Sequence, residues 1–262
     1  MIQISRSELS RLRDAQLDIF YANLVAFFKT EEPILFATLS DEQCRVWAQA
    51  MHTRCLEHQF STAASIYAWA DFSLLLGSHF HRDALYADLM AIISAVTPLT
   101  ERGTMLRAQT WVGDYLQKVR GPKNEHAVTA LKNIRAFHDA HLDPADFHPP
   151  TDKPLDQYVA EIVQASCQPL NQYHDVAQIR ARASACMAHC QTHYALQQPW
   201  HICCMSLLGM FFGAGFDVDE LYPWIQKPLS RAPEIGGEKA VEKLVSRTRI
   251  WLDNVLSPVK NT

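Results

Sequence analysis

The order of apolar and polar positions along the chain predicts helices throughout and gives almost no strand signal. Apolar residues recur mostly at intervals of three and four, which places them on one face of a helix. Capping boxes mark helix starts at residues 5–8 and 40–43, and Gly77 and Gly213 stand where left-handed residues end helices. Alternation with a period of two, which indicates strands, is hard to find. We therefore expect an all-α protein, a compact multi-helix bundle of about eleven helices.

Two segments of the chain match each other at almost constant spacing. Residues 41–90 align with residues 176–226, and further matches follow in the same order. Chance similarity between amphipathic helices is the alternative, but an ordered series of matches favours duplication. We therefore predict that the bundle is built from two diverged repeats. The matched pairs include Cys55 with Cys190 and His58 with His193 at one offset, then Phe80 with Phe216, Asp83 with Asp219 and Arg107 with Arg247 after small slips.

A proline-rich segment separates the two repeats. Residues 143–154 contain four prolines, which exclude a regular helix or a central strand there. The sequence thus divides into a first helical half at residues 1–142, this linker, and a second half at residues 155–262. Each half has a wide apolar face to cover, so we expect the two to pack as one body. In the second half, helices are predicted near residues 155–168, 175–195, 199–212, 218–226 and 237–256.

Charge and cysteine content narrow the possible partners and location. The net charge is −4 and no block of basic residues occurs, so there is no electrostatic case for a nucleic-acid partner. No apolar run reaches the roughly 20 residues that a membrane helix needs, and the N-terminus has no signal-peptide pattern. The seven cysteines are an odd number, and several lie in apolar helices. We expect reduced thiols and a cytoplasmic protein.

One helix face in the second half combines thiols and imidazoles. Cys186, His189, Cys190 and His193 stand at positions i, i+3, i+4 and i+7. These are suitable ligands for zinc or copper, but four residues along one straight helix do not converge on a single tetrahedral ion. The simpler interpretation is that the cysteines lie buried in a helix interface and the histidines lie near its rim. We expect no metal and no cofactor, and keep these four residues as the rival metal site.

An acid in an apolar segment offers an enzymatic alternative. Asp71 lies among large apolar residues, and His79 and His81 follow it closely. Together they suggest an acid–base site. The favoured alternative is a structural role for Asp71, either paired with an arginine such as Arg82 or Arg54 or hydrogen-bonded to a backbone amide at a helix start. The chain has no phosphate-binding loop, dinucleotide fingerprint, serine-hydrolase elbow or zinc-protease motif. We therefore expect a protein without catalytic residues.

Two stretches of the first half carry a recognisable pattern, at the opening of the chain and at residues 60–83. The positions of this pattern are filled by Ile4, Leu9, Trp69, Asp71, Leu76, Gly77, Phe80 and Asp83. Over roughly residues 1–95 the chain resembles uncharacterised helical proteins encoded beside the spike and effector genes of bacterial type VI secretion systems. The second half keeps only the end of the pattern, at Phe216 and Asp219, and has Ser206 in place of the internal aspartate.

The resemblance implies a role in partner binding, either as immunity against a cognate toxin or in loading an effector. We therefore expect a non-enzymatic protein-binding module, in the first place a cytoplasmic immunity protein that neutralises a secreted antibacterial toxin. An effector-loading adaptor, or an enzyme at one of the two sites above, is the alternative. A mildly acidic helical surface suits the basic catalytic cleft of a toxin. The expected partner-binding residues lie at loop–helix junctions: Asp83, Asp217, Asp219 and Glu220.

Overall fold

The computed structural model describes residues 5–97 and 99–257, so Ile4 of the family pattern lies outside the described residues. Over the described ranges the chain is helical and contains no strand, which confirms the all-α prediction. The α-helices are α1 (Arg6–Glu31), α2 (Pro33–Phe36), α3 (Asp41–Glu57), α4 (Ala63–Leu76), α5 (Ala87–Ser94), α6 (Glu101–Arg120), α7 (Glu125–Ala140), α8 (Leu155–Ser166), α9 (Val176–Tyr194), α10 (Pro199–Phe212), α11 (Pro223–Leu229), α12 (Ala232–Ile235) and α13 (Gly237–Leu256). Short 3-10 helices are η1 (Phe80–Arg82), η2 (Ala84–Tyr86), η3 (Pro122–Asn124), η4 (Pro144–Asp146), η5 (Gln168–Gln172) and η6 (Phe216–Val218).

The helix starts follow the capping chemistry of the sequence. The side chains of Ser5, Ser40 and Asp175 each accept a hydrogen bond from the backbone N–H three residues on. The Glu or Gln side chain at that later position accepts a hydrogen bond from the backbone N–H of the capping residue. The predicted helix at residues 218–226 is wrong in detail. That segment forms η6 and then α11, because Pro223 fits only the first turn of a new helix.

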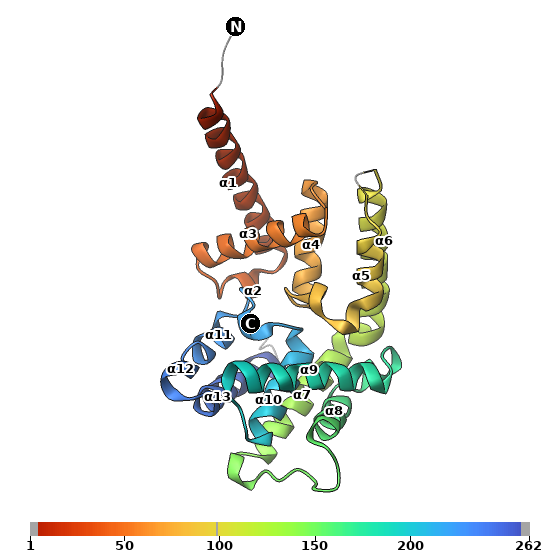
Figure 1. Cartoon of the computed structure of the whole chain (residues 1–262), viewed down its shortest axis with the longest axis vertical. Helices are drawn as coiled ribbons and strands as arrows, with labels where there is room; N and C mark the ends of the chain where they lie inside the picture. The colour runs from red at the N-terminus through yellow and green to blue at the C-terminus, as the bar shows by residue number, and fades with distance from the viewer. Residues whose placement is uncertain (1–4, 98, 258–262) are drawn as a thin grey trace.

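The helices form two bodies, with α1 to α6 in one and α7 to α13 in the other (Figure 1). The first core is centred on buried Trp47, Trp69 and Phe72. The second lies around α10, on which Ile202 and Met205 are fully buried. The apolar stripe of each helix therefore faces its own body, as expected for packed amphipathic helices.

The boundary between the two bodies differs from the predicted one. Helix α7 was expected in the first half, but Leu131 and Ile134 pack with Leu252 of α13 and with residues of α8. The chain passes between the bodies at Gly121, where the backbone has a positive φ of 70°. The proline-rich segment runs within the second body, because the apolar face of α7 finds its cover there.

The second body repeats the order of elements of the first. Helices α4 and α10 both have 14 residues, and α6 and α13 both have 20. A 3-10 turn follows α4 and α10 at matching places, η1 and η6. After each turn an aspartate accepts a hydrogen bond from the amide two residues on, Asp83 from Leu85 and Asp219 from Leu221. The duplication itself stays a prediction, to be tested by superposing residues 41–119 on residues 176–256.

A search of the described part of the chain for helices with the length and apolar character of a bilayer-crossing segment finds none.

Candidate functional site

The two bodies meet at the ends of their central helices. Gly77 ends α4 and Gly213 ends α10, with φ values of 96° and 93°. A Cβ atom on Gly77 would lie 2.4 Å from the carbonyl oxygen of Phe212, and one on Gly213 would lie 2.5 Å from the carbonyl oxygen of Leu76. Only glycine allows both the left-handed backbone and this approach of one backbone to the other. We call this contact and its surrounding ion pairs the junction.

Buried polar pairs cross the junction. The carboxylate of Asp83 forms an ion pair with Arg182 of α9, and the two side chains are 1% and 7% exposed. Asp219 accepts hydrogen bonds from the backbone amide of Ser78 at 3.0 Å and from its hydroxyl at 2.7 Å. Because Asp83 and Ser78 belong to the first body and the other two to the second, these contacts fix how the bodies sit together.

The remaining two acidic candidates are also engaged inside the molecule. Glu220 holds both Nη atoms of Arg54, at 2.8 and 3.3 Å. Asp217 accepts from the Nε2 of His189 and from the hydroxyl of Tyr194, both at 2.7 Å. The prediction that the acidic residues project toward a partner is therefore wrong for all four: Asp83, Asp217 and Asp219 are buried and Glu220 is largely covered. Burying an unpaired carboxylate costs much free energy, so each of these carboxylates has a hydrogen-bond or ion-pair partner within the fold.

The His189–Asp217 pair makes stability depend on pH. The hydrogen bond that His189 donates to Asp217 raises the pKa of His189, although burial opposes the shift. Burial favours a higher pKa for Asp217, but hydrogen bonds from His189 and Tyr194 outweigh it and lower the pKa. The histidine contributes stability below its unfolded pKa of about 6.5 and loses it as pH rises through the raised value. The aspartate contributes stability above its unfolded pKa of about 3.9, and this contribution is lost on acidification.

The pair should therefore stabilise the fold most between about pH 4 and 6.5. We expect His189→Gln to lower the free energy of unfolding more at pH 5.5 than at pH 9, by less than about 1 kcal/mol, because solvent screens this partly exposed imidazole. Urea titrations of both proteins at the two pH values test this. A larger loss at pH 9 would contradict the assigned direction.

The structure separates the parts of the proposed acid–base site. Asp71 is exposed, and its pKa is raised by desolvation first and then by Glu32, with Arg120 opposing. Burial, and next Arg54, lowers the pKa of His79 to about 4. His81 faces His58 and Trp69, and burial first lowers its pKa to about 3. Both imidazoles are thus neutral at pH 7 and neither is coupled to Asp71. The predicted pairing of Asp71 with Arg54 or Arg82 is wrong. No described basic side chain lies within ion-pair distance of the Asp71 carboxylate.

The thiols and imidazoles of α9 point to different surroundings. Cys190 is fully buried, whereas His193 is exposed and its ring lies 4.3 Å from that of His189 in a tilted arrangement. The pKa of Cys186 is lowered, first by a hydrogen bond from Cys190 and then by Ser206 and Arg182, against the effect of burial. Over the described ranges no group of three or more metal-ligating side chains is placed to hold an ion. All seven cysteines are free thiols.

A cavity of about 570 Å3 lies beside the junction, between the two bodies. Its walls come from the end of α4, from α6 and α7, and from the second-body helices α10, α11 and α13. Most of the side chains are large and apolar, among them Leu75, Leu131, Met210 and Trp251. Volume and apolar walls of this kind are typical of small-molecule sites.

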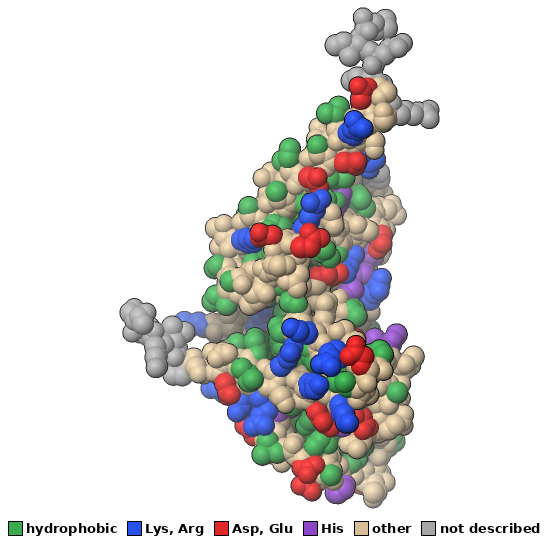
Figure 2. Space-filling model, turned by 90° about the vertical axis from the view of Figure 1, so that its left-hand side faces the viewer, with side chains coloured by type: hydrophobic (Ala, Val, Ile, Leu, Met, Phe, Trp, Pro, Cys, Tyr) green, Lys and Arg blue, Asp and Glu red, His purple; other side chains and the backbone are tan. Residues whose placement is uncertain are grey.

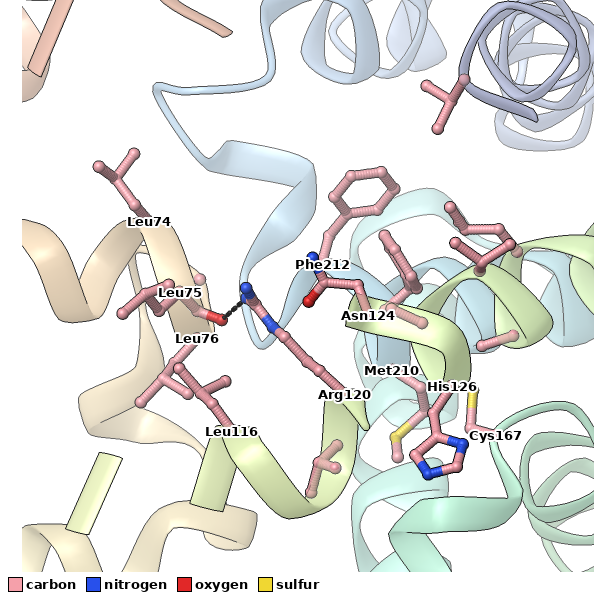
Figure 3. Close-up of a pocket in the computed structure, with 18 of the residues that line it drawn as sticks. Leu74, Leu75, Leu76, Leu116, Arg120, Asn124, His126, Cys167, Met210 and Phe212 are labelled. Atoms are coloured by element: carbon pink, nitrogen blue, oxygen red, sulfur yellow. Dashed lines mark hydrogen bonds between the residues drawn. The ribbon is translucent and has the colours of Figure 1, made fainter. Parts of the chain in front are cut away.

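Arg120 is the cation of this cavity. It extends from the last turn of α6, and its Nη2 donates a 2.7 Å hydrogen bond to the carbonyl oxygen of Leu75 (Figure 3). Leu75 lies in the last turn of α4, so this bond satisfies a carbonyl that the helix leaves free. Among the described residues that line the cavity, Arg120 is the only lysine or arginine.

A second exposed feature is the outer face of α1. The N-terminal part of this helix projects beyond the first body (Figure 1). Tyr21, through a 2.8 Å contact with His52, and Asp18, through an ion pair with Arg45, attach its C-terminal part to α3. Hydrophobic side chains lie at the surface of the projecting part (Figure 2). Leu9, Leu12 and Ile19 are 53%, 56% and 63% exposed.

The exposed positions on α1 follow a heptad-like spacing. We define the α1 seam by residues separated alternately by three and four positions, all of which are exposed: Leu9, Leu12, Gln16, Ile19, Asn23 and Ala26. This spacing keeps the residues in line along one face of a helix. The seam spans about 27 Å at the usual helical rise.

Sequence reasoning missed both the cavity and the seam. In the sequence, Leu9, Leu12 and Ile19 are only apolar positions at helical spacing, and their exposure depends on how far α1 extends beyond α3. Arg120 could be noticed only as a cation directly before the Gly121 helix stop. No protein-family model, no curated protein and no solved structure matches the chain.

Proposed function

We propose that the chain is a non-enzymatic protein-binding module whose partner docks on the α1 seam. The observation that carries the proposal is the exposure of Leu9, Leu12 and Ile19 on a helix that projects from the body. An exposed apolar stripe of this kind on a soluble surface marks an interaction site. The candidate catalytic groups support the same conclusion, because they are separated from one another or engaged in structural contacts.

The spacing of the seam favours one kind of partner element, a single amphipathic helix. Side chains at alternating intervals of three and four each insert into a hole formed by four residues of a facing helix. Gln16 and Asn23 are polar interruptions among Leu9, Leu12 and Ile19. In helix pairs such polar positions fix the register at a cost in affinity. A partner helix with apolar residues at the same spacing therefore suits this face better than a flat or extended segment.

We further propose that this partner is a secreted antibacterial effector, and that the chain acts as its cytoplasmic immunity protein. The resemblance to proteins encoded beside type VI secretion genes supports this, and it covers the region that contains α1. Because the four acidic residues are engaged inside the fold, we propose the apolar seam as the contact surface in their place. An adaptor that loads the effector would use the same seam, and the two roles differ in whether binding protects a cell from the effector.

The seam is tested by measuring the Kd for the product of an adjacent effector gene. Leu12→Glu combined with Ile19→Glu places two charges in the apolar interface, so we expect binding to weaken by about 100-fold or more. The matched control is Val176→Glu, because Val176 is 65% exposed on α9, far from α1 in the sequence. Circular dichroism checks that both variants stay folded.

Three results decide the proposal. Loss of binding in the seam variant alone, together with loss of protection when effector and variant are co-expressed, supports the immunity role. Equal affinity of the seam variant and the parent protein would exclude the seam. A self-associating parent that becomes monomeric in the seam variant would show that a second copy of the chain occupies the seam, and would overturn the hetero-partner proposal.

A further inference from the structure

The cavity beside the junction has a shape and lining that the protein-binding proposal does not use. An open apolar cleft of about 570 Å3 between the two bodies has the size and lining that are typical of small-molecule sites. Residues of both bodies face it, including Leu75, Tyr115, Met210 and Trp251. Such walls accept a flexible or rigid hydrocarbon group and offer few hydrogen bonds to water.

The polar chemistry of the cavity centres on Arg120. Its guanidinium enters the cavity wall and uses one donor on the Leu75 carbonyl (Figure 3). Within the described residues, no carboxylate lies within ion-pair distance of it, although twelve other such pairs are formed elsewhere. The guanidinium therefore keeps donors for a ligand, and its planar fork fits a carboxylate with two parallel hydrogen bonds.

Two neighbouring acids restrict the charge of the ligand. Glu32 lines the cavity, and Asp71 lies close enough to interact electrostatically with both Glu32 and Arg120. A dianionic phosphate at Arg120 would be repelled by both carboxylates more strongly than a single negative charge. A monoanion with a compact head group suits this mixed environment. A cationic head group would leave the guanidinium donors of Arg120 without an acceptor.

We propose that the cavity binds an amphiphilic monocarboxylate, with its hydrocarbon tail among the apolar walls and its carboxylate on Arg120. The site is separate from the α1 seam, so it goes beyond the proposed function. The tail supplies affinity through the apolar area it buries, and the carboxylate supplies orientation and selectivity. Trp224 and Trp251 stack on each other and line the cavity, so their fluorescence reports on an occupant.

The test is a titration of the full chain, delipidated beforehand, with laurate and with methyl laurate as the uncharged counterpart. Calorimetry and tryptophan fluorescence measure the Kd values. A charge-assisted hydrogen-bond pair contributes about one to two orders of magnitude in affinity, so we expect laurate to bind at least tenfold more tightly than its ester. Arg120→Gln should lose this preference and leave the affinity for the ester unchanged. Arg120→Lys should retain part of it.

Two controls keep the result interpretable. Arg107→Gln removes an exposed arginine of the same helix that does not line the cavity, so it should bind laurate as the parent does. Leu131→Trp narrows the cavity and should weaken binding of both ligands. Thermal melting by circular dichroism identifies any variant that fails to fold, in which case the comparison of laurate with its ester on the parent protein decides.

Equal affinities for the two ligands, or no saturable binding, would overturn the proposal. Tighter binding of lauryl phosphate than of laurate would overturn the choice of a carboxylate. None of these outcomes changes the result expected for the seam variants.

Discussion

Replacing Gly77 with alanine should lower the free energy of unfolding by about 3–5 kcal/mol. Two effects add. Gly77 has φ 96°, a conformation that L-residues adopt only with strain. The new Cβ atom would also lie 2.4 Å from the carbonyl oxygen of Phe212 and 3.1 Å from the Cα of Gly213, so two backbones must move apart. Because those backbones belong to different bodies, the change opens the junction.

The chain offers a matched control for this prediction. Gly236 has φ 88° and ψ 146°, close to the φ 96° and ψ 144° of Gly77, but a Cβ atom there would meet nothing within 4 Å. Gly236→Ala should therefore show only the backbone strain, about 1–3 kcal/mol. Urea titration followed by circular dichroism gives both values. Equal losses in the two variants would mean that the close approach of the bodies contributes nothing.

Removing the charge of Asp83 should lower the free energy of unfolding by about as much as Gly77→Ala does. In Asp83→Asn the buried guanidinium of Arg182 loses its carboxylate, and breaking one side of a buried pair typically costs about 3–5 kcal/mol. Burial lowers the pKa of Arg182, but only to about 10, so the side chain stays charged at neutral pH and cannot escape the penalty. An asparagine oxygen can still accept from the amide of Leu85, which preserves the local turn.

A double-mutant cycle isolates the contact between the two side chains. Asp83→Asn combined with Arg182→Met removes both charges, so it should be less destabilised than the sum of the two single variants. The exposed pair of Arg45 and Asp18 is the reference, and Arg45→Ala should cost less than about 1 kcal/mol. Additive losses in the buried pair would show that the ion pair does not link the bodies.

The sequence predicted which segments form helices better than it predicted what those helices pack against. The caps at Ser40 and Asp175 and the glycine ends of α4 and α10 are local signals, since each depends on neighbours within a few residues. The assignment of α7 to the first half failed because its apolar face is equally able to pack on either body. Only the tertiary arrangement determines that this face of α7 packs against α8 and α13.

The candidate site was less predictable for the same reason. Acidic residues at loop–helix junctions look exposed in a sequence, yet Asp83 and Asp219 sit where the second body covers them. Their partners, Arg182 and Ser78, are far away along the chain, so no local pattern identifies them. The cavity is built from segments of both bodies. Its lining therefore becomes visible only when their relative position is known.

Hydrogen–deuterium exchange on the chain, with and without the product of an adjacent effector gene, tests directly whether the partner docks on the α1 seam. We expect the partner to slow exchange along the seam of α1, at residues 9–26, including the part of the helix that projects beyond the first body. Amides next to the cavity should keep their exchange rates. Slowed exchange that leaves α1 unchanged and falls instead on another surface would contradict binding at the seam.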